Sequence, residues 1–95
     1  MGYNVNRMML SEADVYTRLR DSARRIDSAL IVDRGSVHRI DGPFPGVSYN
    51  LVLGDAHALL FLPAADIDGA GWEDRVPQRL EAARGYLIGF TRPPR

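Results

Sequence analysis

Residues 42–63, GPFPGVSYNLVLGDAHALLFLP, contain the strongest strand signals in the chain. In VSYNLVL, apolar and polar residues alternate, which is the period-two pattern of a strand with one buried face. The run ALLFL is continuously apolar, as in a central strand buried on both faces. GDAH lies between the two runs and predicts a turn. We therefore expect an antiparallel hairpin that Pro63 ends.

The residues before this hairpin predict a helix followed by a further hairpin. Ser11 is a suitable N-cap, and Asp14 completes a capping box three residues later. Apolar residues then recur at helical spacing, at Val15, Leu19, Ala23, Ile26 and Leu30. Beyond this helix, the sequence predicts a strand at 30–32, a turn at DRGS (33–36) and a returning strand at 37–40.

The residues after Pro63 predict a loop, a second helix and a last strand. The helix covers residues 72–85. Asp74 is expected to cap its start, and Gly85 is expected to end it in the left-handed backbone conformation. YLIGF at 86–90 then predicts a short strand, and the tail at 91–95 is expected to be disordered.

These elements predict one α+β domain over residues 1–95, in the order α-β-β-β-β-α-β. Short turns make consecutive strands antiparallel, and two amphipathic helices suffice to cover one face of a sheet of about five strands. The expected architecture is a two-layer sandwich, with residues 1–9 as an extended N-terminal segment.

Composition and charge narrow the functional classes. The chain has no cysteine, which removes thiolate chemistry and fits a reducing compartment. Twelve basic residues balance twelve acidic ones, whereas a dedicated nucleic-acid binder usually carries a basic excess. No segment approaches the length of about 18 apolar residues that a membrane helix needs, and no signal peptide is recognisable. We therefore expect a cytoplasmic protein.

The two histidines are the first candidates for catalysis or metal binding. A zinc site would need His38 and His57 together with nearby carboxylates, and their spacing brings no two imidazoles onto one helix face. No Gly-x-Ser-x-Gly motif accompanies them. We interpret both histidines as structural or solvent-facing, and they would gain a catalytic role only if they met in a cleft beside a carboxylate.

Asp66 and Asp68 are a second metal candidate, because they match positions one and three of a calcium loop. Position five is Ala70, however, and position twelve, where a bidentate glutamate is required, is Pro77. The sequence therefore favours no calcium site and predicts no cofactor.

Three residues are candidates for binding a partner. Arg20 and Arg24 stand four apart on the first helix and form a basic strip, with Asp27 close enough to offset Arg24. Phe44 lies between two prolines, so it is either held away from the core or folded back over the sheet.

We expect a non-enzymatic protein-binding module, an inhibitor or regulator that occupies the surface of a protein partner, of the kind that phages and mobile elements also encode. One alternative is a nucleic-acid-associated protein that uses the arginine strip. Another is a small hydrolase or metal site around His38 and His57. We also expect that the strand at 86–90 is a sheet edge through which two copies could pair.

Overall fold

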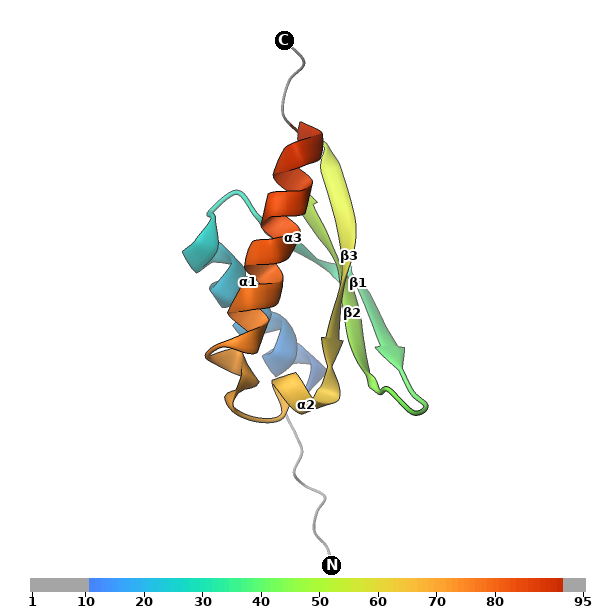
Figure 1. Ribbon diagram of the computed structural model, residues 1–95. Helices are drawn as coiled ribbons and strands as arrows, with labels where there is room; N and C mark the ends of the chain where they lie inside the picture. Colours follow the sequence, from blue (N-terminus) through green and yellow to red (C-terminus); the bar gives the residue numbers. More distant parts are fainter. Residues whose placement is uncertain (1–10, 92–95) are drawn as a thin grey trace, which may run out of the picture.

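The computed structural model describes residues 11–91. Figure 1 shows the elements in chain order, which are α1 (Glu12–Ile26), β1 (Ile31–Ile40), β2 (Gly46–Leu53), β3 (Ala56–Pro63), α2 (Ala64–Ile67), the 3-10 turn η2 (Ala70–Trp72) and α3 (Arg75–Thr91). Across these residues, no helix is both long and apolar enough to cross a lipid bilayer.

The hairpin predicted from VSYNLVL and ALLFL is confirmed as β2 and β3, but the expectation that ALLFL is a central strand buried on both faces is wrong, because β3 is an outer strand of the sheet and Leu59 is exposed. The pair is antiparallel, and its register runs from Leu53 opposite Ala56 to Gly46 opposite Pro63. Gly54 has a φ of 61°, whereas Asp55 has no positive φ. A two-residue connection with glycine in that conformation at its first position is a type II′ turn, whose twist matches that of the strands it joins.

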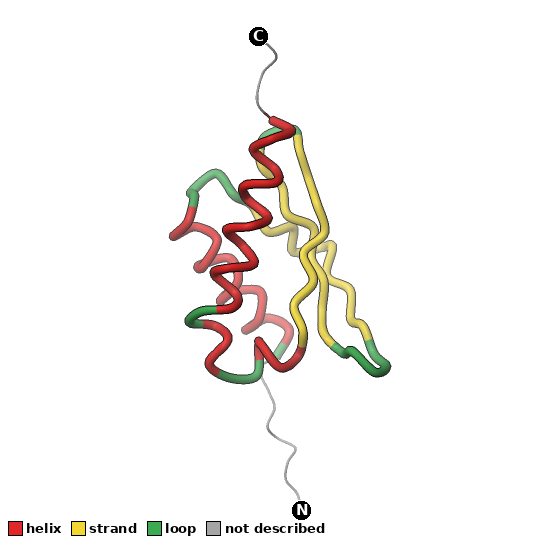
Figure 2. Tube along the Cα trace, viewed as in Figure 1, coloured by secondary structure: helices red, strands yellow, loops and turns green. Residues whose placement is uncertain are grey.

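The predicted α+β class is confirmed, but the sheet has three strands rather than five, in the order β1-β2-β3. Helices α1 and α3 lie side by side on one face of this sheet, so the other face carries no helix in the described chain (Figures 1 and 2). The core lies between the two layers, and its largest fully buried side chains are Tyr49, Leu19, Leu51, Leu62, Leu80, Leu87 and Val76.

Helix α1 begins where the capping residues predict. The Ser11 hydroxyl accepts a hydrogen bond from the backbone N–H of Asp14 at 3.1 Å. Val15, Leu19 and Ala23 are buried on the inner face, as their helical spacing requires. The helix is therefore fixed at its start by the cap and along its length by the core.

The predicted hairpin at residues 30–40 is wrong, because these residues form the single strand β1. Asp33 pairs with Asn50 and His38 with Ser48, so β1 advances five residues while β2 advances two, and three residues of β1 are extra. The turn-forming residues produce a bulge of three extra residues instead of a chain reversal.

Ser36 holds this bulge against β2. Its hydroxyl donates to the carbonyl of Asp33 at 2.6 Å and accepts from the N–H of Asn50 at 2.7 Å. The Asp33 carboxylate in turn accepts from the N–H of Gly35 at 3.1 Å. The Ser36 side chain therefore takes the place of a backbone partner for β2, and the strand continues past the bulge.

The predicted strand at 86–90 is also wrong, because α3 continues through Gly85 and Gly89 to Thr91. The spacing of Val76, Leu80 and Leu87 keeps all three on the buried side of one long helix. Each internal glycine costs about 1 kcal/mol relative to alanine. Burial of the Leu87 side chain supplies about 1.5–3 kcal/mol in the opposite direction.

The ends of the domain fall partly outside the described residues. Thr91 belongs to α3 rather than to a disordered tail, while the predictions for residues 1–9 and 92–95 lie outside the described part of the chain. Because 86–90 is helical, the sheet edge expected there for dimerisation does not exist.

The connection between β3 and α3 was expected to be a loop and contains α2 and η2. The indole N–H of Trp72 donates to the carbonyl of Ile67 at 2.9 Å, and its ring packs against the core. Gly71 is required here, because a Cβ atom at this position would overlap the backbone of Asp66. The connection is thus a packed structure that determines where α3 begins.

We predict that Ser36→Ala destabilises the protein by about 1–3 kcal/mol, because the N–H of Asn50 loses its partner in a half-buried position. Urea unfolding followed by circular dichroism measures the change. Ser28→Ala is the matched control, since Ser28 is exposed just after α1 and should change stability by less than about 0.5 kcal/mol. Equal effects of the two substitutions would contradict the role given to the Ser36 hydroxyl.

Candidate functional site

The β1–β2 loop, residues 41–45, carries the most exposed large apolar side chain among the described residues. Phe44 is 79% exposed, so the loop holds it away from the sheet rather than folding it back as a lid. Gly42 has a φ of 103°, a conformation that glycine adopts without strain. At the other end of the loop, the carbonyl of Pro45 accepts from the N–H of Ala64 at 2.9 Å. The loop is therefore anchored to the start of α2.

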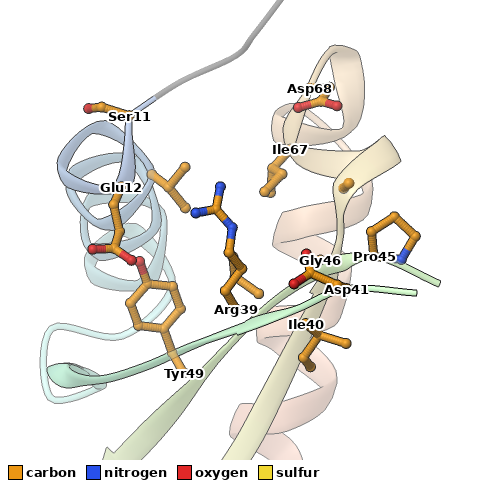
Figure 3. Close-up of a pocket in the computed structure, with 13 residues that line it drawn as sticks. Ser11, Glu12, Arg39, Ile40, Asp41, Pro45, Gly46, Tyr49, Ile67 and Asp68 are labelled. Carbon is orange, nitrogen blue, oxygen red and sulfur yellow. The ribbon is translucent and has the colours of Figure 1, made fainter. Parts of the chain in front are cut away.

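A pocket of about 330 Å³ opens beside this loop. Its walls come from the start of α1, the end of β1, the start of β2, and α2 (Figure 3). The apolar lining consists of Val15, Ile40, Pro45, Val47, Ala64 and Ile67. The volume lies at the lower end of the range of small-ligand pockets, so it is large enough for one or two side chains of a partner.

Tyr49 forms one wall of the pocket and is only 1% exposed. Its hydroxyl makes no hydrogen bond with any described residue, and it points toward the Glu12 carboxylate in Figure 3. Burial raises the pKa of the Tyr49 hydroxyl, and the negative charge of Glu12 raises it further. The hydroxyl therefore stays protonated and has a proton to donate.

Arg39 stands in the middle of the pocket, with its guanidinium directed away from the sheet (Figure 3). It makes no ion pair with any carboxylate between residues 11 and 91. Glu12, Asp41 and Asp68 also line the pocket, so three carboxylates surround one cation. The pocket therefore has an acidic excess.

The two predicted arginines of α1 differ in their environments. Arg20 is half-buried and forms an ion pair with Asp21 at 3.1 Å, and its guanidinium lies 5.8 Å from the centre of the Tyr16 ring. Arg24 is exposed on the last turn of α1. Of the two arginines in the predicted basic strip, Arg24 is thus the more exposed, and Arg20 is the one that forms an ion pair.

Asp27 was expected to offset Arg24 but contacts α3 instead. Its carboxylate accepts from Arg84 at 2.7 Å and from the N–H of Ala29 at 2.9 Å. The hydrogen bond from Arg84, followed by the one from Ala29, lowers the pKa of Asp27. The ionised Asp27 carboxylate therefore stabilises the fold when the pH is above the usual pKa of an aspartate. This contribution is lost as the pH falls through the lowered pKa of the folded state.

The structure does not bring Phe44 and the arginine strip together. In Figure 1 the loop at 41–45 lies at the lower right tip of the sheet, whereas the end of α1 lies on the left side of the molecule. The three residues that the sequence singled out therefore belong to two separate surfaces.

His38 and His57 do not form a common site. Both are exposed, His38 opposite Ser48 and His57 opposite Val52. Ser48 and Val52 are four positions apart on β2, which is about 13 Å along the strand. Among the described residues, no group of three or more histidine or carboxylate side chains is placed to hold a metal ion.

The Asp66 carboxylate is already engaged by two arginines. Asp66 is 4% exposed, and its oxygens lie 3.4 Å from Arg75 and 3.0 Å from Arg79 of α3. Asp68 faces the pocket instead. Asp66 is therefore paired with α3, whose start it helps to position, while Asp68 belongs to the lining of the pocket.

The sequence singled out Phe44 but left open whether it is exposed or folded over the sheet, and it gave no sign of the pocket beside the loop. Alternation in VSYNLVL correctly predicted that Tyr49 faces the core. It carried no sign that α1 would bring Glu12 near the Tyr49 hydroxyl, or that the bulge would turn Arg39 toward the helices. These contacts join segments that are far apart in the sequence.

Comparisons of the chain with protein-family models, with curated proteins and with solved structures gave no match. The function must therefore be argued from the geometry of this molecule.

We predict that Tyr49→Phe leaves the free energy of unfolding unchanged or raises it by about 1 kcal/mol, because it removes a buried hydroxyl that lacks a hydrogen-bond partner. Chemical unfolding at neutral pH measures this, with Tyr86→Phe as the exposed control. A loss of more than about 1 kcal/mol would show that the hydroxyl is bonded in solution.

The same variant has an expected pH dependence. Because the folded pKa of Tyr49 lies above its ordinary value of 10.0, the native state resists deprotonation of this side chain. Wild-type stability should fall as the pH rises above 10, and Tyr49→Phe should lack that part of the fall. Identical pH profiles of the two proteins between pH 9 and 11 would contradict the burial effect.

Proposed function

We propose that this chain is a small cytoplasmic protein-binding module without catalytic activity, which inhibits or regulates a protein partner by occupying its surface. Its binding pole consists of the loop at 41–45 and the adjacent pocket. The observation that carries the proposal is the 79% exposure of Phe44 on an anchored loop. The absence of cysteine supports the cytoplasmic assignment.

Phe44 has the properties of an interface anchor. Burying a phenylalanine side chain supplies about 1.5–3 kcal/mol, and aromatic residues are enriched at the centres of interfaces. Prolines on both sides and the hydrogen bond from Ala64 to Pro45 limit the motion of the loop. Little conformational entropy is therefore lost when the loop docks.

The charges of the pocket indicate what else the partner presents. Glu12, Asp41 and Asp68 outnumber Arg39, so a basic side chain would enter favourably and an acidic one would not. We infer a partner with an apolar cavity for Phe44 and an adjacent lysine or arginine that reaches the pocket.

A second candidate is nucleic-acid binding through α1. Arg34 lies 5.2 Å from the centre of the Tyr16 ring, which Arg20 also approaches, so a third arginine adjoins the strip that includes Arg24. The ion pair between Arg20 and Asp21 weakens this candidate, because it neutralises one of the three charges. Phosphate binding by this surface would fall steeply with salt.

The test compares two variants that each remove one exposed aromatic side chain. Phe44→Ala is expected to weaken capture of a stoichiometric protein partner from the lysate of the producing cell at least tenfold, whereas Tyr86→Ala, in the C-terminal half of α3, retains wild-type capture. Affinity purification followed by mass spectrometry, with and without nuclease, measures both. Equal capture by the two variants would contradict the proposal, and loss of the partner on nuclease treatment would favour the arginine surface.

A further inference from the structure

The two outer strands of the sheet differ in how their edges are protected. Strand β1 carries the bulge together with three charged side chains, Asp33, Arg34 and Arg39. Bulges and charges are the common means by which proteins prevent an edge strand from pairing with another chain. Strand β3, AHALLFLP, has no acidic or basic residue other than His57, and its register against β2 is continuous.

The outer edge of β3 has no strand beside it in the described part of the chain. Helix α3 packs on β3 from the face of the sheet, as Figure 1 shows. Alternate residues of β3 therefore present backbone groups to the outside, and Pro63, which lacks an N–H, is the last residue of the strand.

The type II′ turn identifies which backbone groups face outward. In a two-residue hairpin the residues that flank the turn, here Leu53 and Ala56, form a hydrogen-bonded pair. Hydrogen-bonded and non-bonded pairs then alternate along an antiparallel ladder. The N–H and C=O groups of His57, Leu59 and Phe61 are therefore directed away from β2.

The side chains of these three residues lie on the face without helices. Leu59 is 73% exposed, and His57 is exposed beside it. The Phe61 ring covers Gly46, where a Cβ atom would come within 2.7 Å of the ring. An unprotected edge and an exposed leucine thus coincide at the middle of one strand.

We propose that a second copy of this chain pairs with β3 in an antiparallel manner, about a two-fold axis at Leu59, and joins the two sheets into one of six strands. In this register Leu59 faces its own copy, and His57 of each chain faces Phe61 of the other. All three outward-facing residues then form hydrogen-bonded pairs, which gives six backbone hydrogen bonds.

The strand is self-complementary in a way that favours a second copy over another protein. The pairing places no carboxylate or guanidinium opposite a like charge, because the only ionisable side chain of β3 is His57 and it faces Phe61. Each Pro63 lies beyond the three paired positions, so its missing N–H removes none of the six bonds. An isologous pairing of this kind closes on itself and does not propagate into a fibre.

The test uses the absence of cysteine from the chain. Leu59→Cys places two sulfhydryl-bearing residues across the axis at about 5.5 Å between Cα atoms, within the range of a disulfide. Ile31→Cys is the matched control, because Ile31 is 56% exposed on the same face but belongs to β1. Under mild oxidation, we expect Leu59→Cys to form a disulfide-linked dimer at least tenfold faster than Ile31→Cys.

Sedimentation equilibrium of the unmodified chain gives the second measurement. We expect a monomer–dimer equilibrium that Leu59→Lys abolishes and Ile31→Lys does not, since only the former brings like charges together at the axis. Both sites are exposed, so both variants should fold, which circular dichroism checks. A wild-type monomer at millimolar concentration, or equal cross-linking of the two cysteine variants, would overturn the proposal. Phe44→Ala should dimerise as the wild type does, which separates this test from that of the binding pole.

Discussion

The central position of β2 is the constraint on which the rest of the structure depends. This strand pairs with β1 on one side and β3 on the other, and its inward residues Tyr49 and Leu51 are among the most buried side chains. Because side chains alternate along a strand, a slip of one residue would exchange its buried and open faces. The type II′ turn fixes the register of β2 with β3. The hydrogen bond from Asn50 to Ser36 holds the bulge of β1 against β2, and pairing of these two strands resumes beyond it. Both helices then pack against a sheet whose register is already determined.

A three-stranded sheet with two helices has consequences for the surface. Helices α1 and α3 fill one face, and no described element covers the other. Both outer strands are edges of the sheet. Two exposed apolar residues, Leu59 and Ile31, lie on its open face. A three-stranded sheet with both described long helices on one side leaves its other face open in the described part of the chain. Its open surfaces are therefore expected consequences of the fold, and only their detailed chemistry distinguishes functional sites among them.

The sequence predicts the elements whose signals are local. The cap at Ser11 and the alternation in VSYNLVL each specify one structure by short-range chemistry, and both are confirmed. The DRGS segment carries equally strong turn chemistry, yet Asp33 and Ser36 use it to stabilise a bulge, because β2 offers the N–H of Asn50 as a partner. Residues 86–90 are too few to distinguish strand from helix by periodicity. Their helical state follows from the position of Leu87 in a pattern that begins at Val76.

The features of the candidate site also differ in whether they depend on local sequence or on contacts between distant segments. The two prolines beside Phe44 are a local signal of a stiff loop, but they leave the direction of the ring open, and only the structure shows that Phe44 is exposed. Arg20 forms an ion pair with its sequence neighbour Asp21, and its guanidinium also lies near the Tyr16 ring, which the spacing of the arginines on the helix did not indicate. The pocket joins three separate segments, and no short-range pattern specifies such a meeting.

The pole at which these segments meet combines features that folding alone would disfavour. An exposed Phe44 forgoes about 1.5–3 kcal/mol of burial. The Tyr49 hydroxyl is buried without a described hydrogen-bond partner, and a group of that kind costs about 1–3 kcal/mol. Arg39 stands among carboxylates without forming an ion pair with any of those described. Departures from local stability rules tend to concentrate where a protein binds or reacts. All three lie at one end of the molecule, whereas the arginine strip and the histidines show no comparable cost. This is the physical reason for proposing that a protein partner binds at the loop and its pocket rather than on α1.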